Sequence, residues 1–119
     1  MSINDEIVKI NSYLAKELWM DFEVYKLNAG EVILSGFLDE MDSDKIRIKF
    51  IQPYMMVCTM SFTFEGGMNF ISVLEGEEAI EMNKKYQVTE GNNIFMFSNT
   101  NINSRMFLIA KKIEFQILE

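Results

Sequence analysis

The sequence RMFLIAKKIEFQIL, residues 105–118, contains two different hydrophobic patterns. Positions 106–110 are apolar without interruption, whereas polar and apolar residues alternate from Lys112 onward. A strand that is apolar on both faces is covered on both sides and lies centrally in its sheet. Alternation is typical of a strand with one face in the core. Lys111 falls on the apolar register, which predicts a bulge or a rim position.

The same period of two recurs upstream. Residues 45–50 alternate, and Gln52-Pro53 should end that strand, because proline donates no hydrogen bond and holds Gln52 extended. Residues 56–65 also alternate, with the apolar side chains at even positions. Gly66-Gly67 then predicts a two-residue hairpin turn into a strand at 68–74.

A helix is predicted at the N-terminus. Its apolar stripe is formed by Ile3, Ile7, Ile10, Leu14 and Leu18, which recur at helical spacing. Ser2, three residues before Asp5, is a capping residue that starts the helix almost at the terminus. The stripe predicts that the helix ends near residues 19–21.

The remaining segments complete an α+β layout. Further strands are predicted at 22–28, 31–40, 86–89 and 94–98, and residues 75–85 form either a short helix or a polar loop. Because the connections are short, neighbouring strands should be antiparallel. We expect residues 1–119 to form a single α+β domain, in which the N-terminal helix packs on the concave face of a curved, mainly antiparallel sheet of about six to seven strands. Closure of this sheet into a half-barrel stays open.

Residues 54–62, YMMVCTMSF, raise the question of a soft-metal site, because they contain three methionines and the only cysteine. Thioether and thiolate ligands select Cu(I). Phe62 and Phe64 continue the same face, however, and the chain has no histidine. Methionine is a common filler of gaps in a core. The prediction is therefore buried packing, with no metal and no cofactor.

The absence of histidine also removes the commonest general base, and no nucleophile or phosphate-loop motif is present. A carboxylate-dependent enzyme stays as an alternative, since acids cluster at 75–81. Such a run is more often a solvated face. We expect a protein that is not an enzyme.

The charge is strongly acidic. The net charge is −7, and residues 1–44 contain ten acidic and three basic side chains. This balance opposes binding to nucleic acids and to anionic membranes. One cysteine forms no internal disulfide, and acids stand where a signal peptide needs lysines. We therefore expect a cytoplasmic protein, whose acidic field suits a basic protein partner.

Small size, acidic charge, an α+β layout and missing catalytic chemistry are features that the chain shares with immunity proteins, which neutralise basic bacterial toxins. The hypothesis is a non-catalytic binding module of this immunity or inhibitor type. The candidate partner-binding residues are Asp39, Glu40, Asp42, Asp44, Glu75, Glu77, Glu78 and Glu81, with Trp19, Phe22 and Tyr25 as aromatic anchors. The alternative is a barrel-like sheet that encloses a small apolar ligand among its Met and Phe side chains. A homodimer through an exposed strand edge stays open.

Overall fold

The computed structural model describes residues 2–39 and 43–118. Its first element is helix α1, Ile3–Leu14, which begins as predicted: the Ser2 hydroxyl accepts a hydrogen bond from the Asp5 amide at 3.2 Å. The predicted end near residues 19–21 is wrong. The helix stops at Leu14, and Leu18 is 88% exposed, so it does not belong to the buried stripe.

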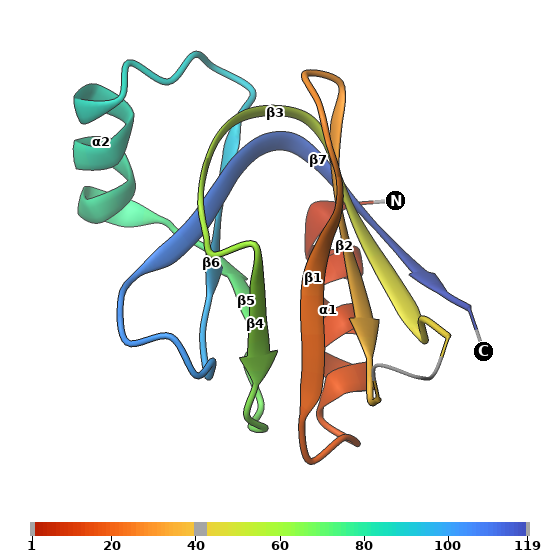
Figure 1. Cartoon of the computed structure of the whole chain (residues 1–119). Helices are drawn as coiled ribbons and strands as arrows, with labels where there is room; N and C mark the ends of the chain where they lie inside the picture. Colours follow the sequence, from red (N-terminus) through yellow and green to blue (C-terminus); the bar gives the residue numbers. More distant parts are fainter. Residues whose placement is uncertain (1, 40–42, 119) are drawn as a thin grey trace.

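Seven strands of the described residues form one curved sheet, as Figure 1 shows. The strands are β1 (Met20–Leu27), β2 (Glu31–Phe37), β3 (Ile46–Val57), β4 (Ser61–Phe64), β5 (Ile71–Val73), β6 (Asn93–Phe97) and β7 (Met106–Ile117), and helix α2 (Gly76–Lys85) lies between β5 and β6 in the chain. Their order in the sheet is β4-β1-β2-β3-β7-β6-β5, and every neighbouring pair is antiparallel. The expected α+β fold is confirmed, and the sheet forms a half-barrel.

Strand β7 lies between β3 and β6, and positions 106–110 are buried on both faces, as predicted. On the inner face, Leu108 belongs to the same core cluster as Ile10 and Leu14 of α1. On the outer face, Phe107 and Ile109 pack with side chains of α2. Two helices on opposite faces therefore explain the uninterrupted apolar run.

The concave face is filled by phenylalanine rings. Phe70 is fully buried, and its ring stacks on Phe22 with a centroid distance of 4.8 Å. Its other ring neighbours are Phe62, Phe64 and Phe97, at centroid distances of 6.1, 5.4 and 5.5 Å. Contacts of this geometry are favourable beyond the area they bury.

Strand β3 does not end at Gln52-Pro53, so this prediction is wrong. The strand continues to Val57, with a register shift after Pro53 and a positive φ of 53° at Gln52 in place of the expected extended conformation. The reason is the pairing of β3. Its pairing with β2 ends at Ile51, so the rest of β3 pairs with β7 alone. Proline is tolerated in a strand that has a neighbour on one side only. The exposed Lys111 lies opposite this bend.

The alternating segment 56–65 is not one strand. Its first residues end β3 and its last form β4, which pairs with β1 at one edge of the sheet. The predicted hairpin at Gly66-Gly67 is also wrong, because β5 lies at the opposite edge. The free side of β4 is instead hydrogen-bonded to the β6–β7 loop, with Asn101 donating to Thr63 and Glu65 donating to Asn99.

Helix α2 resolves the alternative that the sequence left open at 75–85. The strand predicted at 86–89 is wrong, because this segment is a turn that follows the helix. Its carbonyls at Tyr86 and Gln87 accept hydrogen bonds from the Tyr54 hydroxyl, at 2.6 and 2.9 Å. These bonds attach the end of α2 to β3.

Neither helix of the described residues has the length and apolar composition needed to cross a membrane.

Candidate functional site

The predicted acidic residues lie in two separate places. Asp39 and Asp44 flank the β2–β3 turn, whereas Glu75, Glu77, Glu78 and Glu81 lie on or beside α2, at the other end of the molecule in Figure 1. Glu40 and Asp42 lie outside the described residues. The fold therefore does not bring the two groups together into one acidic surface.

The acids of α2 face solvent. Glu77 and Glu81 are one helical turn apart and exposed, and Glu78 pairs with Arg105 at 2.7 Å. Glu75 occupies the N-cap position without a capping hydrogen bond from its side chain. Isolated exposed ion pairs contribute little to stability. This group has the features of a solvated helix face.

The three predicted aromatic anchors differ in exposure. Phe22 is only 1% exposed and belongs to the core, so its assignment as an anchor is wrong. Trp19 and Tyr25 are 42% and 53% exposed. Because Met20, Phe22 and Val24 point inward, Asp21 and Glu23 point to the outer face of β1. Tyr25 lies at a register shift of β1 and contacts Arg47, and Trp19 precedes the strand.

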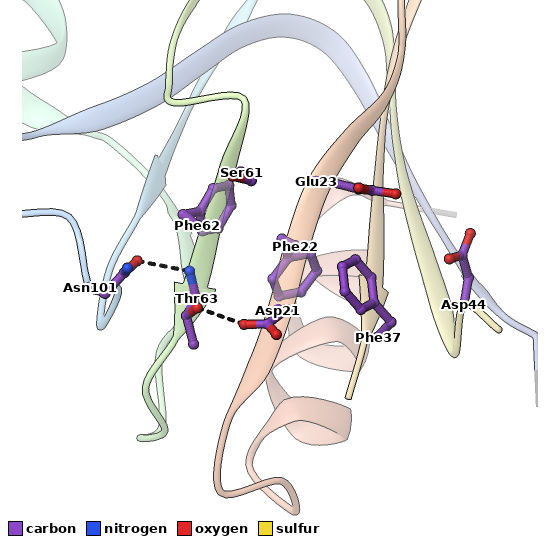
Figure 2. Close-up of a pocket in the computed structure, with 9 residues that line it drawn as sticks. All are labelled: Asp21, Phe22, Glu23, Phe37, Asp44, Ser61, Phe62, Thr63 and Asn101. Atoms are coloured by element: carbon purple, nitrogen blue, oxygen red, sulfur yellow. Dashed lines mark hydrogen bonds between the residues drawn. The ribbon is translucent and has the colours of Figure 1, made fainter. Parts of the chain in front are cut away.

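A groove runs along this outer face, between β4, β1 and β2 (Figure 2). Its volume is about 530 Å³. The lining residues are Asp21, Phe22, Glu23, Phe37, Asp44, Ser61, Phe62, Thr63 and Asn101. Three of these side chains are carboxylates and none is cationic, so the groove carries a negative potential.

Hydrogen bonds orient one side of the groove. The Thr63 hydroxyl donates to Asp21 Oδ1 at 2.6 Å, and the Thr63 amide donates to Asn101 Oδ1 at 2.8 Å. Both bonds are drawn in Figure 2. They tie the β6–β7 loop, β4 and β1 together and turn the Asp21 carboxylate toward β4. The wall on this side is therefore built from three segments that are distant in sequence.

On the other side of the groove, Asp44 is engaged by a cation of the protein itself. Arg47 Nη2 lies 3.3 Å from Asp44 Oδ2, and the Arg47 guanidinium carbon lies 4.3 Å from the centre of the Tyr25 ring. Among residues 2–39 and 43–118, Asp21 and Glu23 have no cationic partner. These two carboxylates are the available charges of the groove.

Sequence reasoning missed Asp21 and Glu23. The usable signal was the alternation of Met20, Phe22 and Val24 with Asp21 and Glu23, which places the two acids on the outer face of one strand. Phe22, itself predicted as an anchor, lies between these two acids and obscures the signal.

An ion-pair network links β1, β2 and β3 away from the groove. Glu31 on β2 accepts hydrogen bonds from Lys26 at 2.8 Å and Lys49 at 3.1 Å. These two bonds hold the pKa of the Glu31 carboxyl below its ordinary value, and the bond from Lys26 has the larger effect. The same bond raises the pKa of Lys26. Here the single acid Glu31 is paired with two lysines, in contrast to Asp21 and Glu23.

Cys58 and the acids offer little chemistry. Cys58 lies in the link between β3 and β4, and burial raises the pKa of its thiol to about 11, which keeps it protonated at neutral pH. Within the described parts of the chain, no group of three or more His, Cys, Asp or Glu side chains is arranged to hold a metal ion.

The chain was compared with protein families, curated proteins and solved structures. No family model, curated protein or solved structure matches the chain.

Proposed function

We propose that the protein is a non-catalytic binding module that holds a basic protein partner on an acidic surface, in the manner of an immunity or inhibitor protein that neutralises a basic bacterial toxin. The observation that carries this proposal is the groove on the outer face of β1, where Asp21 and Glu23 have no cationic partner within the described residues. Carboxylates without an internal cationic partner are available to pair with cations of another protein.

The surroundings of the groove support a protein partner. Trp19 and Tyr25 are exposed and lie within two residues of Asp21 and Glu23 in the chain, and aromatic side chains are enriched among residues that dominate binding energy. Leu18 extends the apolar surface beside Trp19. Apolar contacts beside unpaired acids combine affinity with fast, electrostatically steered association.

The interior of the sheet supports this proposal over the alternative of an apolar-ligand container. Edge-to-face and tilted contacts extend the ring cluster from Phe70 to Phe97, Phe50 and Phe95. The centroid distances are 5.5 Å for Phe70–Phe97, 6.1 Å for Phe50–Phe97 and 5.4 Å for Phe50–Phe95. Met60, which the container needs as lining, is exposed. Rings at these distances fill the space that a ligand would occupy.

The proposal is tested with two variants of equal net charge. Asp21→Asn/Glu23→Gln neutralises the groove, and Glu77→Gln/Glu81→Gln neutralises two exposed acids of α2. Each tagged variant and the wild type is used for affinity capture from the native cells at low salt, with mass spectrometry, and any captured protein is then purified for binding measurements.

A basic protein held by the wild type and by the α2 variant, but at least about tenfold more weakly by the groove variant, supports the proposal. Its affinity should also fall as salt rises. If both variants lose the same affinity, the protein acts through overall charge and the groove is not the site. If the captured protein is acidic, the proposal fails.

A further inference from the structure

We infer that the uncovered outer face of β1 receives an arginine side chain of the partner, whose guanidinium lies against Phe37 and pairs with Glu23 and Asp21. This inference rests on the proposed function and names the chemistry that the groove recognises. The outer face of β1 is open within the described residues, and acids without a cationic partner favour a cationic occupant.

The face is available because the two helices lie elsewhere. Helix α1 packs in the inner core, and α2 covers the outer face of β6 and β7. Figure 1 shows α2 on the side of the arch away from β1 and β2. The outer side chains of β1 therefore meet no other layer within the described residues.

The protein contains its own example of how this face takes a guanidinium. Arg47 places its guanidinium over the Tyr25 ring and donates to Asp44. The ring face supplies cation–π attraction and the carboxylate supplies charge-assisted hydrogen bonding. One aromatic ring and one acid thus hold one arginine at the edge of the groove.

The groove repeats this combination without a guanidinium in it. Figure 2 shows the Phe37 ring between β1 and the Asp44 side, with Glu23 beside it and Asp21 on the adjoining wall. By register, Asp21 lies directly opposite Phe37 on the neighbouring strand. Ser61, Thr63 and Asn101 add oxygen atoms that accept hydrogen bonds.

Arginine fits this arrangement better than lysine. Its planar guanidinium stacks on aromatic faces and donates several hydrogen bonds in a fixed fork, whereas the lysine ammonium is a compact and strongly hydrated charge. A groove that combines a ring, two carboxylates and neutral acceptors should therefore discriminate between the two. Overall negative charge alone would not.

The test uses an arginine-rich and a lysine-rich peptide of equal length and charge, titrated by calorimetry at low salt into the wild type and three variants. The variants are Asp21→Asn/Glu23→Gln in the groove, Phe37→Leu at the ring, and Glu77→Gln/Glu81→Gln on α2 as the matched control. The wild type should bind the arginine peptide at least about threefold more tightly.

This preference should fall to about one in the groove and Phe37→Leu variants and persist in the α2 control. The inference would be overturned if the wild type bound the two peptides with equal affinity or bound neither of them. It would also be overturned if the α2 control lost the preference for the arginine peptide to the same extent as the groove variant. If the ratio is one while a captured basic partner is still lost by the groove variant, the arginine assignment fails and the proposed function stands. Both fail if that partner is indifferent to the groove variant.

Discussion

Strands β7 and β1 belong to the same sheet and differ in what covers their outer faces. On β7, Phe107 and Ile109 are buried beneath α2, together with Met82 and Tyr86. On β1, the corresponding outer positions carry Asp21 and Glu23 and face a groove. Both strands have an apolar inner face, so the inner face does not distinguish them.

The comparison shows which face of each strand serves stability. Burial of the outer face of β7 removes apolar area from water and therefore contributes to folding. The outer face of β1 contributes little to folding and is free to carry side chains that suit a partner. Four substitutions test this division, in order of decreasing effect.

Ile109→Ala should lower the free energy of unfolding by about 2–5 kcal/mol, since it leaves a cavity under α2. Its counterpart on the outer face of β1, Tyr25→Ala, removes an exposed ring and its contact with Arg47, and should cost less than about 1 kcal/mol. Urea unfolding followed by Trp19 fluorescence measures both. Equal losses would mean that the two faces serve stability alike.

Asn11→Ala should cost about 1–3 kcal/mol, because Asn11 joins α1 to the edge strand β5. Its amide oxygen accepts from the Phe70 and Ile71 amides, and its amide nitrogen donates to the Ile71 carbonyl, at distances of 2.9 to 3.1 Å. The control is Ser12→Ala, the exposed neighbour on the helix, with an expected change within about 0.5 kcal/mol. Similar unfolding midpoints for the two variants would show that this connection is not needed.

Gly36→Ala should cost about 1–3 kcal/mol by overpacking the inner face behind the groove. An added Cβ would lie 2.7 Å from Met20 Sδ and 2.8 Å from Ile46 Cγ1. Gly30→Ala is the control, since its Cβ would meet only Asn28 Oδ1 at 3.4 Å in the exposed β1–β2 turn. Thermal unfolding compares them, and a neutral Gly36→Ala would indicate slack in this part of the core.

Glu31→Gln should have the smallest effect, with a distinct pH dependence. Bonds from Lys26 and Lys49 lower the folded-state pKa of Glu31, so its stabilising contribution is present above the unfolded-state pKa. That contribution is lost as the pH falls through the folded-state pKa. The stability difference between wild type and variant should therefore be constant near neutral pH and shrink in acid. A difference that persists in acid would assign it to packing.

Much of the fold was predictable because its causes are local. The uninterrupted apolar run at 106–110 requires cover on both faces wherever the strand lies. The Ser2 cap depends on residues within one helical turn, and the short connections dictate antiparallel pairing. The excess of acids in the first third of the chain was also visible in the sequence.

Other features depended on partners that are distant in the chain. Alternation assigns each side chain of residues 56–65 to a face but does not say which strand lies beside it, so the division between β3 and β4 was not predicted. Leu18 fits the helical period, yet it is exposed in the folded protein and the helix has already ended at Leu14. Pro53 is accommodated only because β2 ends before reaching it.

The sequence by itself determined the fold class, the double burial of β7 and the acidic charge, since composition and period carry them. Only the folded arrangement of the strands brings particular acids to one groove. Asp21, Glu23 and Asp44 line one groove because β1, β2 and the segment before β3 are adjacent. The more conspicuous run from Glu75 to Glu81 lies on or beside α2. Electrostatic interaction depends on separation in space and on available partners, and neither is set by distance along the chain.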